Sequence, residues 1–294
     1  MQTKPHEPVM ADEVVQYLAP RPGGTYVDCT VGAGGHARRV AEAMGRGRLI
    51  GFDKDPEALA EAAKAEMPAG VQFELVQGDY RGAPEEVRAR GVERVDGVVA
   101  DLGMSSMQVD HAERGFGFAA NGPLDMRMDP RQELTAERVV NRMDERELAD
   151  LIFQYGEERR SRRIARAIVR SRPLRSTAEL AELVAAVNRP VNKHGRGLHP
   201  ATRTFQALRM YVNSEIEALT ALLAALPAWL APQGRAVVIS FHSLEDRPVK
   251  RAFRAGAQRG EYKILTPHAV RPSEGECRSN RRARSAKLRA AARI

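Results

Sequence analysis

The sequence predicts an α/β protein with a mostly parallel sheet and a helical insertion. Strand-like and helix-like segments alternate over residues 26–101, the alternation then stops, and strand character returns near residue 235. The chain has 294 residues, of which 43% are hydrophobic, so it can bury a full core. We therefore expect one α/β domain interrupted by a helical segment.

Short apolar runs mark the expected strands, and helix-length segments separate the first four. The expected strands are Tyr26–Thr30, Arg48–Asp53, Val71–Val76, Val95–Asp101 and Arg235–Phe241. After the second strand, Asp55 can cap a helix and Pro56 suits its first position. Helical crossovers between strands predict parallel pairing.

The segment from Gly115 to Arg203 lacks strand character and is rich in arginine. Ile164, Ala167 and Ile168 have helical spacing, and the stretch 159–175 carries eight arginines. We expect residues 115–203 to form the inserted domain, with residues 1–114 and 204–294 forming the main one. Beyond it, apolar residues spaced from Phe205 to Leu219 predict one helix that packs back on the sheet.

The charge balance favours a polyanionic partner. The formal net charge is +8, and the tail 278–293 holds seven basic residues and no acid. Composition does not separate nucleic acid from an anionic membrane surface, and either basic run can equally be a solvated face. The longest apolar run, Leu219–Ala231, is too short to span a bilayer and contains Pro227, so we expect no membrane insertion.

Cysteine usage and the first residues favour a cytoplasmic protein. Cys29 and Cys277 lack metal-ligand spacing, so we expect two reduced thiols and no metal site. Residues 1–13 lack the apolar segment of a signal peptide.

A glycine-rich loop follows the first expected strand. Gly32, Gly34 and Ala37 match the pattern G-x-G-x-x-G/A, and Asp53 ends the next strand 21 positions after Gly32. Such a loop lets a ligand approach the backbone, and the acid can accept hydrogen bonds from ribose hydroxyls. A tight turn without a ligand remains the alternative.

The acid before the glycines helps to choose the ligand. Asp28 would sit poorly beside a pyrophosphate but well beside the sulfonium or amino group of S-adenosylmethionine. Asp79 and Tyr80 follow the third strand, where they can meet an adenine amino group and stack on the ring. Ordinary edge packing of Tyr80 is equally compatible with its position.

The fourth expected strand ends at Asp101, and ligands of open α/β sheets bind beyond the carboxyl ends of the strands. Asp101 therefore occupies a position suited to a reaction site. Ser105 and Ser106 follow, and the simpler interpretation of this pair is helix capping.

The chain contains a series of sequence motifs that resemble, in the same order, those of the bacterial small-subunit ribosomal RNA cytosine-N4 methyltransferases of the RsmH (MraW) type. The matching segments are His6–Val9, Asp28–His36, Asp101–Asp110, Arg114–Phe118, Pro123–Asp129, Tyr155–Glu158, His199–Gln206, Ile239–Asp246 and Arg284–Arg289. They extend over nearly the whole chain. Met107, Gly117 and Pro248 depart from the usual pattern, and Pro248 predicts that its helix begins near Asp246 or Arg247.

The resemblance implies a Rossmann-like S-adenosylmethionine-dependent methyltransferase fold with an inserted helical domain. It implies methylation of N4 of a cytidine in the decoding region of 16S rRNA, with that rRNA or the small ribosomal subunit as the partner. The cofactor residues that it implies are Gly34, Gly35, His36, Asp53, Tyr80, Asp101 and Gln108. A homodimer stays open, because the sequence does not decide the oligomeric state.

Several residues are candidates for the substrate side. Asp101 can accept a hydrogen bond from the N4 amino group, although a role toward the cofactor alone explains it equally well. The other candidates for pocket or RNA contact are His199, Arg203, Gln206, His242, Ser243, Glu245 and Asp246, with Phe116 and Phe118 for base stacking. Residues 242–246 can instead begin the next helix, and at least one of the two phenylalanines is expected in the core.

Two other functions use some of the same features. A nicotinamide-dependent dehydrogenase would share the glycine loop, and binding of NAD would identify it. An RNA-binding module with a vestigial cofactor loop would bind rRNA without methyl transfer. Asp53, Asp101 and Gln108 together argue against a vestigial loop.

Overall fold

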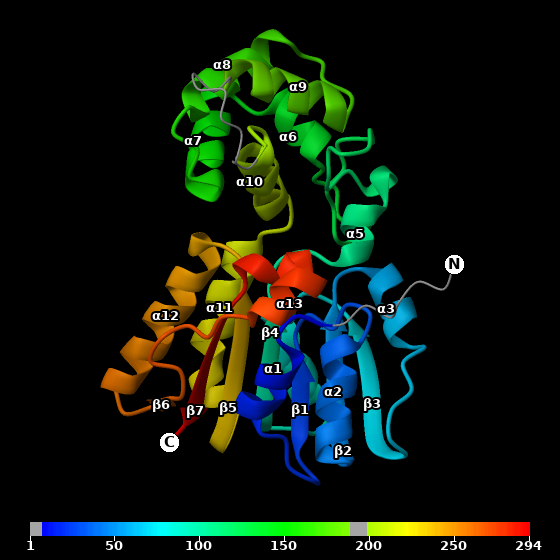
Figure 1. Ribbon diagram of the computed structural model, residues 1–294, viewed down its shortest axis with the longest axis vertical. Coiled ribbons are helices and arrows are strands. Elements are labelled where there is room, and N and C mark those ends of the chain that lie inside the picture. The colour runs from blue at the N-terminus through cyan, green and yellow to red at the C-terminus, as the bar shows by residue number, and fades with distance from the viewer. Residues whose placement is uncertain (1–7, 189–198) are drawn as a thin grey trace. The chain divides into compact units, whose positions relative to one another are not determined.

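A computed structural model describes residues 8–188 and 199–294, so His6 and Glu7 of the first matching segment lie outside the described residues. The chain forms two compact units (Figure 1). The first comprises the chain up to Gly103 and from Ile216 onwards, and the second is Met104–Glu215. The second unit starts earlier and ends later than the expected insertion 115–203, because flanking helical segments pack within it.

A seven-stranded sheet forms the centre of the first unit, in the order β3-β2-β1-β4-β5-β7-β6. The strands are β1 (Thr25–Asp28), β2 (Arg46–Asp53), β3 (Gly70–Gln77), β4 (Val95–Asp101), β5 (Leu230–Ser240), β6 (Tyr262–Ile264) and β7 (Lys287–Arg293). The five expected strands pair in parallel, whereas β7 is antiparallel to both β5 and β6. The parallel part has its carboxyl ends at one edge, where the glycine loop and Asp101 lie.

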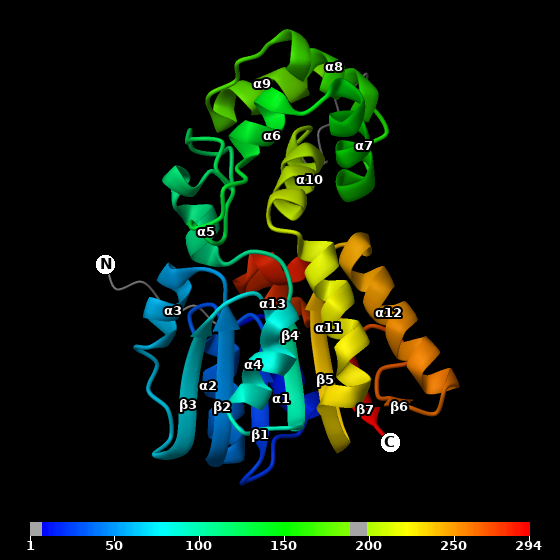
Figure 2. The same cartoon turned by 180° about the vertical axis from the view of Figure 1, so that it is seen from behind.

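Helices cover both faces of the sheet (Figures 1 and 2). One face carries α1 (Ala11–Leu18), α2 (Gly35–Met44) and α3 (Pro56–Ala62), and the other carries α4 (Ala83–Ala89), α11 (Glu215–Trp229) and α12 (Ser243–Gln258). Successive residues of β4 alternate between the two cores, with Val98 and Ala100 in one and Val99 in the other. Burial on both faces explains the continuous apolar strands of the sequence.

The expected helix start after β2 is confirmed. The Asp55 carboxylate accepts a hydrogen bond from the Glu57 amide at 3.1 Å, and Pro56 is the first residue of α3. In contrast, the start expected for the helix around Pro248 is wrong. Helix α12 begins at Ser243 and contains Pro248 in its second turn, where the proline removes one backbone hydrogen bond without ending the helix.

The basic tail is partly a strand, which composition did not predict. The end of the chain forms β7, an inner strand whose Leu288, Ala290 and Ala291 are buried. A run of alanines between basic residues has no strand alternation that local patterning can detect. Arg289 of the basic tail is therefore buried in the sheet and is not part of a solvated face. The short helix α13 (Glu274–Ser279) precedes it.

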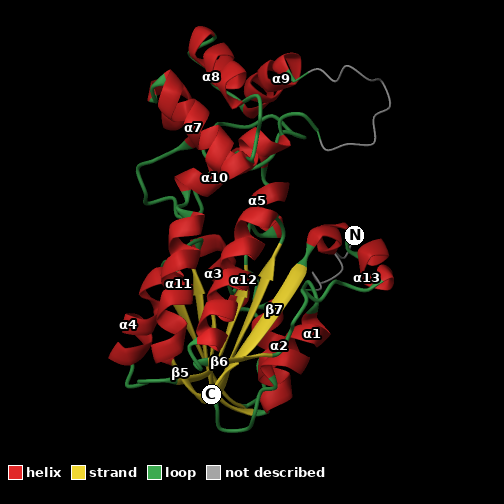
Figure 3. Ribbon diagram, turned by 90° about the vertical axis from the view of Figure 1, so that its left-hand side faces the viewer, coloured by secondary structure: helices red, strands yellow, loops and turns green. Residues whose placement is uncertain are grey.

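The second unit is helical in the residues that the structure describes (Figure 3). Its helices are α5 (Ser106–Asp110), α6 (Ala136–Arg142), α7 (Glu145–Gly156), α8 (Ser161–Arg170), α9 (Thr177–Val187) and α10 (Thr202–Val212). Ile164 and Ile168 are fully buried in its own core, as their spacing predicted. The single helix expected from Phe205 to Leu219 is interrupted: α10 ends at Val212, and Ser214 has a φ of 50° before α11 begins.

Candidate cofactor and reaction site

The glycine loop joins β1 to α2. Gly32 and Gly34 have φ values of 53° and 85°, a region that glycine adopts without strain. A Cβ on Gly34 would also lie 3.3 Å from the Cβ of Ala65, and one on Gly35 would lie 3.1 Å from that of Pro8. The loop geometry and its packing thus require small residues, as the sequence pattern indicated.

Asp53 ties this loop to the end of β2. Its Oδ2 accepts a hydrogen bond from the Gly32 amide at 2.9 Å, and its Oδ1 accepts one from the Asp55 amide at 2.9 Å. Burial raises the pKa of Asp53 to about 6, and the backbone amides only partly offset this effect. Each carboxylate oxygen has a second lone pair, so Asp53 can still accept hydrogen bonds from ribose hydroxyls.

Asp28 is a buried acid at the end of β1, with 2% of its surface exposed. Its Oδ1 accepts a hydrogen bond from the Thr30 amide at 3.1 Å, whereas its buried Oδ2 has no hydrogen bond within the described ranges. Burial raises the pKa of Asp28 to about 6. A buried acceptor without a partner costs free energy, and a cationic or hydrogen-bonding ligand would remove that cost.

His36 lies in the first turn of α2 and contacts Asp101 at the end of β4. The His36 Nε2 is 3.4 Å from Asp101 Oδ2, and the His36 side chain is 6% exposed. Burial disfavours the imidazolium, but the carboxylates of Asp101 and Asp28 outweigh burial, so the pKa of His36 is raised. The arrangement places a buried imidazole against Asp101, within the electrostatic influence of Asp28.

The backbone places Asp101 beside the glycine loop. Its amide donates a hydrogen bond to Thr30 Oγ1 at 2.7 Å, and its buried Oδ1 has no hydrogen bond from the described part of the chain. Sequence reasoning missed Thr30, because a hydroxyl in a loop gives no pattern that names its partner. Asp28, His36, Asp53 and Asp101 are thus brought together at one edge of the sheet.

Asp79 and Tyr80 follow β3 but are engaged within the protein. The Asp79 carboxylate lies 2.8 Å from Lys54 Nζ and 2.7 Å from Arg81. Burial alone would raise the pKa of Asp79, yet the two cations outweigh it and lower the pKa. Tyr80 is half-buried and packs against the sheet core. Packing explains Tyr80, and its role toward an adenine stays a prediction.

Ser105 and Gln108 form a reciprocal cap at the start of α5. The Ser105 Oγ accepts a hydrogen bond from the Gln108 amide at 3.3 Å, and Gln108 Oε1 accepts one from the Ser105 amide at 3.0 Å. The capping interpretation of the serine pair is therefore confirmed for Ser105. Gln108 belongs to the second unit, and its role toward a cofactor stays a prediction.

Of the residues that follow β5, some begin the next helix and one contacts the neighbouring strand. His242 occupies the N-cap position of α12 without a side-chain capping bond, and its Nε2 lies 3.1 Å from Glu245 Oε1. Glu245 also accepts a hydrogen bond from the Phe241 amide at 2.8 Å. Asp246 instead pairs with Arg289 of β7 at 2.6 Å. Asp246 thus has a structural partner that the sequence did not indicate.

The remaining candidates lie in the second unit. The His199 ring lies 4.6 Å from that of Phe118, which is 4.8 Å from the ring of Phe205. Arg203 is exposed and donates a hydrogen bond to the Glu157 carbonyl at 3.1 Å. Phe116 is buried in the core, so of the two predicted stacking residues only Phe118 keeps part of its ring exposed.

No cluster of three or more potential metal ligands occurs among residues 8–188 and 199–294. Over the same ranges, no helix has the length and apolar character that crossing a membrane requires.

The sheet and site define a class of protein. A glycine loop after β1, an acid after β2 and a further acid after β4 are the features of Rossmann-like S-adenosylmethionine-dependent methyltransferases. The chain belongs to the MraW methylase family, whose model matches residues 3–294.

Curated relatives agree with this assignment over at least 94% of their own length. The chain is 51% identical to a "Ribosomal RNA small subunit methyltransferase H" of Koribacter versatilis, over 98% of this chain and 94% of the relative. It is 50% identical to a protein of the same name from Acidobacterium capsulatum, over 99% of both chains. A third, from a Cyanothece species, is 47% identical over 98% of this chain and 95% of the relative.

Proposed function

We propose that this enzyme transfers a methyl group from S-adenosylmethionine to N4 of a cytidine in the decoding region of 16S rRNA. The names of the relatives support the small-subunit rRNA as substrate. The observation that carries the chemical part is the contact of His36 with Asp101 beside the buried Asp28. We place the reaction in the cytoplasm, where small ribosomal subunits are found.

The residues present fit the cofactor. The Asp28 Oδ2, which has no hydrogen bond from any described residue, suits an ammonium or sulfonium group, and Asp53 retains acceptor capacity for ribose hydroxyls. Gly34, Gly35 and His36 would line its binding loop, with Tyr80, Asp101 and Gln108 as further contacts. S-adenosylmethionine, when bound, supplies an electrophilic methyl group on its sulfonium.

The reaction requires the protein to orient N4 and to provide an acceptor for its proton. The lone pair of N4 is delocalised into the cytosine ring, so N4 attacks well only when it is held in line with the methyl group. Bond formation between N4 and the methyl carbon would break the methyl–sulfur bond and leave N4 cationic, so N4 must lose a proton. The buried Oδ1 of Asp101, which lacks a hydrogen bond within the described ranges, is the acceptor that we assign.

Each unit supplies its own candidates for the substrate side. We assign His242 and Ser243 to the cytosine pocket and Arg203 and His199 to RNA contact, with Phe118 as a stacking surface. Asp246 is engaged with Arg289, so its effect on the pocket is indirect. Stacking on exposed rings and phosphate contacts are how proteins hold single-stranded RNA.

The test is transfer of labelled methyl from S-adenosylmethionine to small subunits that lack the modification, with identification of the product nucleoside. We expect N4-methylcytidine. A different nucleoside would contradict the assigned target. Binding of NAD, or RNA binding without methyl transfer, would favour the competing functions.

The role of Asp101 needs a paired comparison. We expect Asp101→Asn to lower the single-turnover rate, measured at saturating cofactor, by about 100-fold or more. Asp96→Asn is the control, because Asp96 lies at the opposite end of β4 and accepts a bond from the Thr25 amide. Full activity of Asp101→Asn would remove Asp101 from proton transfer.

A further inference from the structure

Helix α8 carries a row of exposed arginines on the side opposite its buried residues. Ile164, Ala165 and Ile168 face the core of the second unit. The arginine row, as we name it, consists of Arg159, Arg162, Arg163, Arg166 and Arg170, all of them exposed. Arg163, Arg166 and Arg170 are spaced by three and four residues, which keeps their side chains on one face of the helix, and Arg162 adjoins them. Arg159 lies just before the helix begins.

Neighbouring arginines of the same run have structural roles. Arg160 donates a hydrogen bond to the Val187 carbonyl at 3.4 Å. Arg172 donates to the Val140 and Met143 carbonyls at 2.7 and 2.5 Å. These two guanidinium groups hold loops and helix ends together, so the high arginine content has two separate causes.

The arginine row itself is almost without counter-ions. Arg166 lies 3.4 Å from Glu145, and both side chains are exposed. Within the described ranges, no carboxylate forms an ion pair with Arg159, Arg162, Arg163 or Arg170. Unpaired like charges along one helix face repel one another, so the row lowers the stability of the free protein.

The row borders an open depression of about 400 Å³. Its lining is Arg163, Arg166, Ala167, Arg170, Ser171 and Val187. Arg163 and Arg170 are seven residues apart, which is about 10 Å along an α-helix. A stacked nucleic-acid strand presents a phosphate about every 3.4 Å of its axis, so the row spans about three phosphates.

We infer that the arginine row is a docking surface for the sugar–phosphate backbone of the rRNA substrate, an inference that rests on the proposed function. Guanidinium groups bind phosphate oxygens through paired, charge-assisted hydrogen bonds. An anionic membrane is the less suitable partner, because a helix that binds a membrane surface turns its apolar face to lipid. The apolar face of α8 is buried in its own unit.

The test compares two double variants of the full-length enzyme. Arg163→Ala with Arg170→Ala removes two members of the row. Arg251→Ala with Arg254→Ala, on α12, removes two exposed arginines that likewise have no ion pair among the described residues. Both variants change the net charge equally. The probe is the unmodified small ribosomal subunit, and its affinity is measured from 50 to about 300 mM salt.

We expect the α8 variant to bind the small subunit about tenfold more weakly. The plot of log affinity against log salt should also become less steep, its slope decreasing in magnitude by about 1.5. Cofactor affinity should stay unchanged, and Arg163→Lys with Arg170→Lys should restore most of the slope. Equal losses in the α8 and α12 variants would overturn the proposal, since binding would then follow net charge. A loss of binding only to phosphatidylserine vesicles would also overturn it.

The two proposals fail in different ways. If the unaltered enzyme methylates cytidine and the α8 variant binds subunits normally, the docking surface is wrong and the proposed function stands. If the unaltered enzyme methylates no cytidine while the α8 variant loses subunit binding, the reaction is wrong and the docking surface stands.

Discussion

His36 Nε2 lies 3.4 Å from Asp101 Oδ2, although the two residues are 65 positions apart in the chain (101 − 36). His36 comes from the first turn of α2, and Asp101 ends β4. Parallel pairing of β1 with β4 brings these ends to the same edge of the sheet. Together with Asp28, they form a buried group whose protonation should control cofactor binding.

Cofactor affinity should fall as the pH drops through about 6. The pKa values of Asp28 and Asp53 are both raised to about 6 in the free protein, and the cationic cofactor favours their ionised forms. We expect affinity to fall about tenfold between pH 7 and pH 5, as measured by calorimetry. A pH-independent affinity would show that neither acid faces positive charge.

The same raised pKa values affect folding with a defined sign. Because the folded protein holds these two protons more tightly, their contribution to stability is present below pH 3.8 and lost as the pH rises through about 6.

His36→Gln removes a charge that lowers the pKa of Asp28. The midpoint of the affinity profile should therefore move above pH 6 in that variant.

The Asp246–Arg289 pair should matter for stability more than for chemistry. Both side chains are largely buried, and Arg289→Met leaves the Asp246 carboxylate without its main partner. We expect unfolding to need about 3 kcal/mol less at pH 7, as measured with urea. Arg293→Met is the control, because Arg293 donates to the Glu261 carbonyl at the end of β7.

The pH dependence gives this pair a second check. Burial would raise the pKa of Asp246, but Arg289 and the nearby lysines outweigh it and lower the pKa. Its stabilisation is thus present above pH 3.8 and lost at lower pH, where the variant and the parent should converge. An Arg289→Met variant as stable as the parent at pH 7 would contradict the structural role of the pair.

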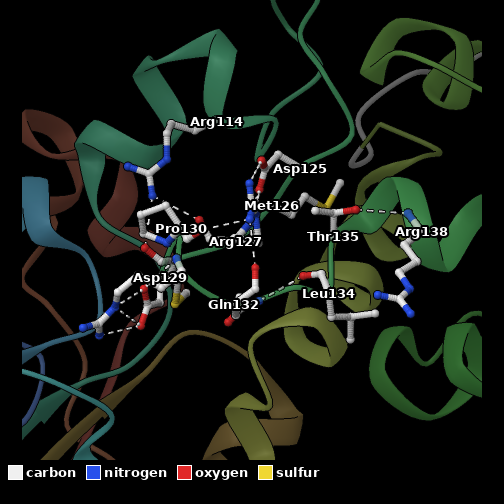
Figure 4. A network of polar contacts seen from close by, with 12 residues as sticks. Arg114, Asp125, Met126, Arg127, Asp129, Pro130, Gln132, Leu134, Thr135 and Arg138 are labelled. Atoms are coloured by element: carbon white, nitrogen blue, oxygen red, sulfur yellow. Dashed lines mark hydrogen bonds and ion pairs between the residues drawn. The ribbon is translucent and has the colours of Figure 1, made fainter.

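Arg127 should hold the loop 125–132 together (Figure 4). It forms a forked pair with Asp125 at 2.8 Å and donates to the Pro130 and Gln132 carbonyls, both at 2.8 Å. Lysine has no fork, so Arg127→Lys should cost about 1–2 kcal/mol and make the loop more sensitive to proteolysis. Arg131→Lys, which alters only the exposed pair with Asp129, should change little.

Capping and cofactor contact can be separated at Gln108. Ser105→Ala and Gln108→Ala each break the capping box of α5 and should each cost about 1 kcal/mol. We expect only Gln108→Ala to lower the affinity for S-adenosylmethionine, by about tenfold. Equal cofactor affinities in the two variants would mean that Gln108 serves as a cap alone.

Local sequence patterns were enough to predict much of the cofactor-binding part of the site. Glycines at positive φ, an acid after β2 and the N-cap of α3 depend on neighbours a few residues away. The carboxyl ends of parallel strands share an edge, so strand prediction also placed Asp28, Asp53 and Asp101 together. The sequence did not predict the break between α10 and α11, because apolar residues keep their helical spacing on both sides of Asn213 and Ser214.

The sequence by itself determined the parallel part of the sheet, the cofactor loop and the existence of a helical insertion, because hydrophobic periodicity and turn residues indicate each of them. Only the tertiary structure decided that the basic tail enters the sheet as β7 and that Arg289 meets Asp246. It also decided which arginines serve the fold and which, on α8, remain without carboxylate partners in the described ranges. Those choices depend on partners far along the chain, and charge alone does not specify its partner.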